Sequence, residues 1–146
     1  MLFRSVLAAF NIVRSAEGKV RRQRLMNNIL YLRKEVARAG MEPLGDPSAI
    51  VPVRVWAEGL ARIASRNLAH FGAIANLVEY PAVPQGGARF RVQVMADHQQ
   101  EEIDVLVGAM LEAMRAADLE FRLHREMERA EANTPPIAGA VAARAA

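Results

Sequence analysis

The stretch that decides the fold lies just beyond the middle of the chain and reads Ala88-Arg89-Phe90-Arg91-Val92-Gln93-Val94-Met95. Apolar and polar side chains alternate along it, and alternation with a period of two is typical of a strand with one buried face. Arg89 and Arg91 therefore project from the same polar side of the expected strand. A guanidinium group binds a carboxylate through two parallel hydrogen bonds, and a strand holds that group still.

The segment before this strand contains more conformationally special residues than a simple turn requires. Its residues combine two prolines and two glycines: Val78-Glu79-Tyr80-Pro81-Ala82-Val83-Pro84-Gln85-Gly86-Gly87. We interpret them as a shaped loop that delivers the arginine pair. The residues alone leave a second interpretation open. The two arginines would then belong to a solvated sheet face and form salt bridges to a neighbouring helix.

Apolar spacing and breaker residues predict the remaining elements. Helices are expected over Val6–Arg14, Glu17–Ala39 and Glu58–Phe71 and from Gln99 onward, and strands over Ile50–Trp56, Ala73–Glu79 and Ala88–Met95. Strands that alternate with amphipathic helices predict an α/β chain of the α+β kind. We expect a small, largely antiparallel three-stranded sheet with helices on one face.

Composition bounds the class of protein. The chain has 146 residues, is 52% apolar and contains no cysteine, which fits one domain with a real core and excludes disulfides and thiolate metal sites. No segment approaches the ~20 apolar residues of a membrane span, so we expect no membrane span and a cytoplasmic protein. The net charge is only +3. The one basic cluster lies between Arg21 and Lys34 without interleaved aromatic residues, which favours a solvated helix face over a nucleic-acid footprint.

Catalytic constellations are not evident in the sequence. His70, His98 and His124 lie far apart without metal-ligand spacing, and we interpret each as a packing, capping or surface residue. No nucleophile elbow or phosphate-binding glycine loop precedes a helix. We therefore predict no catalytic, cofactor-binding or metal-binding residue within this chain.

Four ordered blocks carry a resemblance to a known family: Ser48–Val53, Glu79–Gly86, Ala88–Arg91, and Ala96–His98 leading into Glu101–Asp104. Together they resemble the C-terminal part of the α-oxoamine synthases, over about Val6 to Met114. These are pyridoxal phosphate (PLP) enzymes of fold type I that join an amino acid to an acyl-CoA. They include glycine C-acetyltransferase, 8-amino-7-oxononanoate synthase, 5-aminolevulinate synthase and serine palmitoyltransferase.

The resemblance implies roles for particular residues. The position of Arg91 matches the arginine that binds the substrate carboxylate in that family, whereas Arg89 is expected to support the strand or loop. The loop residues that resemble the border of the acyl-CoA entrance are Tyr80, Pro81, Pro84 and Gly86. Glu79 and Tyr80 stand where several members carry arginine, which favours loops of the glycine C-acetyltransferase or 5-aminolevulinate synthase kind.

The resemblance also implies what lies outside the chain. The family's Schiff-base lysine and its other PLP-binding residues belong to an upstream large domain, and the enzymes are homodimers. Lys19 and Lys34 are the only lysines here, and neither context resembles that of the cofactor lysine. We therefore expect a C-terminal fragment of an acyltransferase of the aminotransferase class I/II superfamily, inactive alone and unable to hold PLP alone.

The expected organisation has three parts. Residues 1–16 combine a possible artefactual start with the remnant of a helix that packs on a missing large domain, residues 17–132 form the small domain, and residues 133–146 form a disordered tail. Two other classes stay open. One is a free-standing regulatory module that binds an amino acid without catalysis, and the other is a basic interaction domain that works through residues 21–34.

Overall fold

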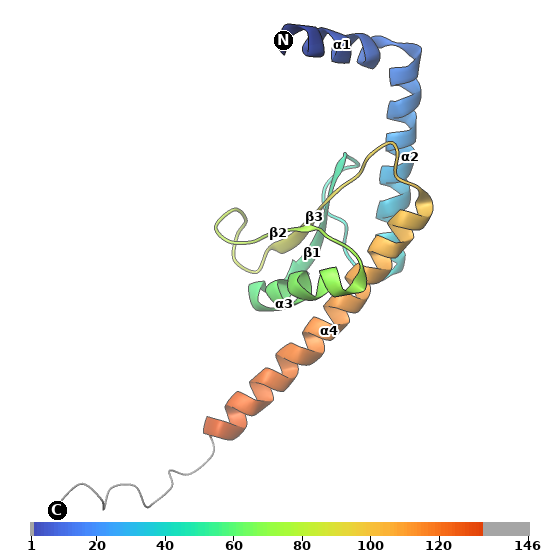
Figure 1. Ribbon diagram of the computed structural model, residues 1–146. Coiled ribbons are helices and arrows are strands. Elements are labelled where there is room, and N and C mark those ends of the chain that lie inside the picture. Colours follow the sequence, from blue (N-terminus) through green and yellow to red (C-terminus); the bar gives the residue numbers. More distant parts are fainter. Residues whose placement is uncertain (1, 133–146) are drawn as a thin grey trace, which may run out of the picture.

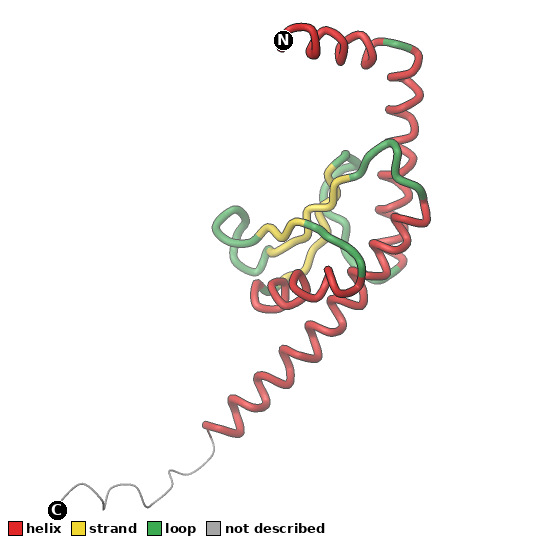
Figure 2. The backbone as a smooth tube through the Cα atoms, in the orientation of Figure 1, coloured by secondary structure: helices red, strands yellow, loops and turns green. Residues whose placement is uncertain are grey.

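The computed structural model describes residues 2–132, and the expected tail at 133–146 lies outside them. Along the chain, the elements are α1 (Leu2–Arg14), α2 (Ala16–Arg38), β1 (Ile50–Trp56), α3 (Glu58–Leu68), the 3-10 helix η1 (Ala69–Phe71), β2 (Asn76–Val78), β3 (Ala88–Gln93) and α4 (Gln100–Ala132) (Figures 1 and 2). The predicted order of elements is confirmed. β2 is shorter than the predicted 73–79, because only residues 76–78 pair with β3. Residues 73–75 approach the sheet without pairing.

The three strands form one antiparallel sheet in the order β1-β3-β2. Val51 lies opposite Val92 and Val53 opposite Phe90, and all four side chains are buried. Because side chains alternate between faces, the intervening residues form a second face, which we call the open face: Pro52, Arg54, Asn76, Val78, Arg89 and Arg91. The prediction of a three-stranded antiparallel sheet with helices on one face is confirmed.

Helices α2, α3 and α4 supply the rest of the core. Their buried apolar residues are Ile29, Leu32 and Val36 on α2, Ala61, Ala64 and Leu68 on α3, and Ile103, Val107, Ala109, Met110, Ala113 and Ala117 on α4. Alanines occupy the region where α3 meets α4, and small side chains let two helices approach closely. At the edge of this contact Arg66 hydrogen-bonds Glu120 and holds the pKa of the Glu120 carboxyl below its usual range.

Helix α4 begins with a partial capping box. The Gln99 N–H donates to Glu102 Oε2 at 2.8 Å, which is one half of a capping box. The Gln99 side chain instead donates its amide to Asp97 O at 3.0 Å. Glu102 therefore compensates in part for a residue that is a poor N-cap.

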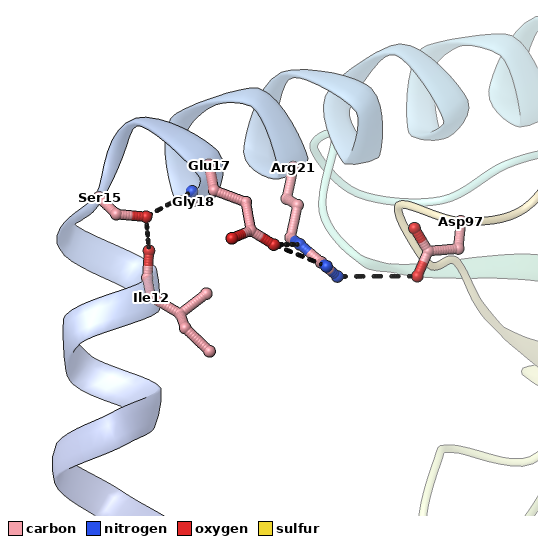
Figure 3. Close-up of polar contacts among 6 residues, drawn as sticks. All are labelled: Ile12, Ser15, Glu17, Gly18, Arg21 and Asp97. Atoms are coloured by element: carbon pink, nitrogen blue, oxygen red, sulfur yellow. Dashed lines mark hydrogen bonds and ion pairs between the residues drawn. The ribbon is translucent and has the colours of Figure 1, made fainter.

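The junction of α1 and α2 is a tight corner (Figure 3). Ser15 is the N-cap of α2, and its Oγ accepts from Gly18 N–H at 3.1 Å and donates to Ile12 O at 2.7 Å. Arg22 donates to Val13 O from the next turn of α2. Residues 3–14 of α1 are exposed, and Figure 1 shows α1 extending away from the sheet. Whether α1 packs on a large domain stays a prediction.

Within residues 2–132, no helix combines the length and the apolar character needed to cross a bilayer.

Candidate functional site

Arg91 lies at the centre of the open face, on the middle strand. Its Cα partners are Pro52 on β1 and Asn76 on β2, so two neighbouring strands fix its backbone. The side chain is exposed, and within residues 2–132 its guanidinium has no hydrogen-bond or ion-pair partner. Arg91 therefore does not form the salt bridge to a neighbouring helix that the second interpretation of the sequence required. Its two-pronged donor is available to an external carboxylate.

Arg89 behaves differently on the same face. It is half-buried, and its Nε donates to Gly87 O at 3.0 Å, so it folds back onto the end of the loop. Whether Arg89 supports the strand or loop in the complete protein stays a prediction.

A cavity of about 480 Å³ adjoins Arg91. It forms where β3 continues past the start of β2 and residues 72–75 turn towards α4. Its polar lining includes Asn76, Gln93, His98 and Glu102, and Ile103 and Leu106 of α4 contribute apolar wall. A charged donor beside mixed polar and apolar walls suits a small amphipathic ligand such as an amino acid.

His98 is a cavity residue that the sequence did not single out. Its Nδ1 lies 3.4 Å from Met95 N and accepts that N–H, while the ring lines the cavity with Arg91. His70 and His124 do not line this cavity. Among the described residues, no group of three histidine, aspartate or glutamate side chains is arranged to hold a metal.

Asn28 holds the turn that carries His98. Its Nδ2 donates to Met95 O at 3.0 Å and to His98 O at 2.9 Å, across 67 and 70 residues of sequence. The α2 helix thereby fixes the cavity wall to the core.

We expect Asn28→Ala to lower the free energy of unfolding by about 1–2 kcal/mol, because two carbonyl groups lose their donor. Urea unfolding followed by circular dichroism measures this loss. Asn27→Ala is the matched control, since the Asn27 side chain accepts only an exposed hydrogen bond from Gln23 on its own helix. Equal losses in the two variants would contradict a positioning role for Asn28.

The loop that carries Tyr80, Pro81, Pro84 and Gly86 is fastened to α3. Arg62 makes a two-pronged contact with Glu79, at 2.9 Å from Nε to Oε2 and 3.0 Å from Nη2 to Oε1, which raises the pKa of Arg62. Gly86 N–H donates to Glu58 Oε1 at 2.8 Å. The Tyr80–Pro81 peptide bond is cis. This loop follows β2, whereas the cavity opens before β2, so the four predicted loop residues do not line it.

The lysines do not supply a cofactor amine to this site. Lys19 and Lys34 lie exposed on α2, and neither lines the cavity. Neither lysine is placed where it could attach a cofactor beside Arg91.

Comparisons with known proteins follow the same part of the chain. The profile described as aminotransferase class I and II matches residues 2–110. An 8-amino-7-oxononanoate synthase of Citrifermentans bemidjiense is 31% identical over 102 residues, covering 70% of this chain and 26% of the relative. The 8-amino-7-oxononanoate synthase/2-amino-3-ketobutyrate coenzyme A ligase of Thermus thermophilus is 36% identical over 105 residues, covering 72% and 26%.

Solved structures agree with these relatives. A serine palmitoyltransferase from S. paucimobilis, solved with a bound PLP–myriocin aldimine, superposes with a TM-score of 0.63 at 26% identity, covering 70% of this chain and 26% of that one. The fold is thus that found in PLP-dependent enzymes of fold type I. The chain belongs to the aminotransferase class I and II family, among the α-oxoamine synthases, whose cofactor is PLP. It spans about a quarter of the length of the curated relatives it matches.

Proposed function

We propose that this chain is the C-terminal, carboxylate-binding part of a PLP-dependent acyltransferase that condenses an amino acid with an acyl-CoA to give an α-oxoamine. The observation that carries the proposal is the unpartnered guanidinium of Arg91, fixed on the middle strand beside a cavity of about 480 Å³. An arginine in this setting recognises a carboxylate by charge and by planar geometry together.

In this proposal the chain binds and orients the amino acid, and residues outside this chain carry out the bond-changing steps. Arg91 holds the amino acid's carboxylate, which fixes the substrate relative to the reacting carbon. PLP, held by residues outside this chain, supplies an electron sink for the carbanion. Tyr80, Pro81, Pro84 and Gly86 border the entrance for the acyl-CoA. The chain alone is inactive, and the complete enzyme is a cytoplasmic homodimer.

A free-standing amino-acid-binding module is the second candidate. The observation in its favour is that Arg91 adjoins a cavity with both polar and apolar walls, which suits an amino acid without further chemistry. The basic interaction domain is less favoured, because Arg21 pairs with Glu17 and Arg33 donates to Leu44 O and Gly45 O. Those guanidinium groups already have partners on the chain's own surface.

Release of free CoA thiol tests the proposal. The polypeptide encoded by the complete locus, incubated with PLP, an acyl-CoA and a panel of amino acids, should release CoA with at least one amino acid. The 146-residue chain should release none. Tight amino-acid binding by the 146-residue chain in calorimetry, with no CoA release by the complete polypeptide, would contradict the enzyme and favour the module.

The matched relatives belong to more than one type of α-oxoamine synthase. The matched names span oxononanoate synthases, a bifunctional ligase and serine palmitoyltransferases, so the preference drawn from Glu79 and Tyr80 stays a prediction. Comparing short acyl-CoA donors with long ones in the same assay would test it.

A further inference from the structure

Trp56 ends β1 in a conformation that bulky residues rarely adopt. Its φ is 76°, in the left-handed region, and a bulge interrupts the pairing of β1 with β3 between Arg54 and Trp56. Trp56 is also 58% exposed, which is high for so large an apolar residue. Strain of this kind persists where the surrounding structure imposes it, and it concentrates at binding and active sites.

Positive charge accumulates beside this indole. The Arg54 guanidinium carbon lies 4.5 Å from the centroid of the Trp56 ring, a cation–π contact. Arg54 also faces Arg89 directly across β1 and β3, and like charges in directly opposed positions destabilise a sheet.

The carboxylate of Glu42 neutralises the charge of Arg54 only in part. Glu42 Oε2 lies 2.9 Å from Arg54 Nε, within ion-pair distance. The angle does not make a hydrogen bond, however, and Arg54 Nε is buried without a hydrogen-bond partner. Because a hydrogen bond needs alignment as well as short distance, this contact is an ion pair without a hydrogen bond. Arg54 is therefore paired with one imperfectly aligned carboxylate, and the opposite Arg89 has no ion-pair partner among the described residues.

We propose that Trp56, Arg54 and Arg89 form a subsite for a purine ring that carries phosphate groups. The indole offers a stacking surface, and the two guanidinium groups offer the planar donors that phosphate oxygens accept. Binding of an anion would relieve the repulsion between Arg54 and Arg89. The ligand's identity rests on the proposed function: the subsite takes the adenosine phosphate end of the acyl-CoA.

The position of the subsite fits that assignment. Trp56 pairs with Ala88, directly after the 79–87 loop, and Glu58 ties the loop to α3 two residues beyond Trp56. Arg91 lies on the same open face but three positions further along β3 than Ala88. The nucleotide and the amino-acid carboxylate thus occupy separate places on one face, with the loop beside the nucleotide.

Fluorescence provides a direct test, because Trp56 is the only tryptophan in the chain. The 146-residue chain is titrated with CoA, with ADP and with pantetheine, under excitation at wavelengths where purines do not absorb. We expect saturable quenching by CoA and by ADP and none by pantetheine, which lacks the nucleotide. Arg54→Gln and Arg89→Gln should each weaken the apparent affinity for ADP about 10-fold. Arg66→Gln, an exposed arginine paired with Glu120, is the matched control and should leave it unchanged.

A second variant separates binding from folding. Trp56→Gly suits the left-handed backbone, so it should fold, and in the complete polypeptide it should raise the KM for acyl-CoA without raising that for the amino acid. Absence of quenching by CoA and ADP, or equal quenching by pantetheine, overturns the subsite. Quenching without CoA release in the complete polypeptide refutes the proposed function and leaves the nucleotide subsite. CoA release without quenching refutes the subsite alone.

Discussion

Arg91→Ala, made in the polypeptide encoded by the complete locus, is expected to lower kcat/KM for the amino acid roughly 30- to 150-fold. A hydrogen bond between charged groups contributes about 1.5–3 kcal/mol, and a two-pronged contact lies in the upper part of that range. The loss should fall mainly on KM, because the guanidinium already binds the charged carboxylate in the enzyme–substrate complex, before any bond changes. The absorbance spectrum of the bound cofactor should not change.

Two further variants make this result specific. Arg91→Lys keeps the charge but offers a point donor in place of a planar fork, so its kcat/KM should lie between those of the parent and Arg91→Ala. Gln93→Ala, two residues along the same strand, should have a much smaller effect if charge recognition is what Arg91 contributes. Steady-state kinetics over a range of amino-acid concentrations give these values. Unaltered kinetics in Arg91→Ala would contradict the role assigned to Arg91.

The strand that carries Arg91 could be predicted because its signal is local. An alternating pattern depends on residues that are neighbours in the sequence, so Ala88–Gln93 was found with only its last two residues misplaced. That the Arg91 guanidinium has no hydrogen-bond or ion-pair partner within residues 2–132 could not be predicted in the same way. It depends on which arginines find acceptors elsewhere in the fold, and Arg62, with its partner Glu79 seventeen residues away, is one that does.

The cavity was missed for the same physical reason. Its wall is set by Asn28, whose carbonyl partners lie 67 and 70 residues along the chain, and nothing in the local sequence marks that pairing. The shortening of β2 has a related cause, because residues 73–75 turn towards the α4 side and help to line the cavity. Trp56 illustrates a third limit. A residue with left-handed backbone conformation is usually glycine, which the sequence would reveal, but in this chain the left-handed position 56 is a tryptophan.

Gly18→Ala is expected to open the corner between α1 and α2. Gly18 is buried at the first turn of α2, and a Cβ there would lie 2.6 Å from Val13 O and 2.9 Å from Val13 C. Both are backbone atoms, so no side-chain rotation relieves the clash and α1 itself must move. The contacts at risk are the cap from Ser15 and the bond from Arg22 to Val13 O. Their loss corresponds to about 2 kcal/mol, or roughly 30-fold in the equilibrium for detaching α1.

Limited proteolysis of the 146-residue chain measures that equilibrium, because cleavage follows the population of the open form when opening is fast. Cleavage within residues 2–14 should accelerate, while the urea midpoint of the sheet and α2–α4 core changes little. Gly108→Ala is the matched control: Gly108 lies inside α4, and apart from neighbouring residues of its own helix no atom lies within 4 Å of its added Cβ. It should stabilise the chain by about 0.5–1 kcal/mol. In the proposed enzyme α1 leads towards the remainder of the protein, so Gly18→Ala should also reduce CoA release there, whereas Gly108→Ala should not. If both variants behaved alike, the corner would be an ordinary helix junction and Gly18 would not set the direction of α1.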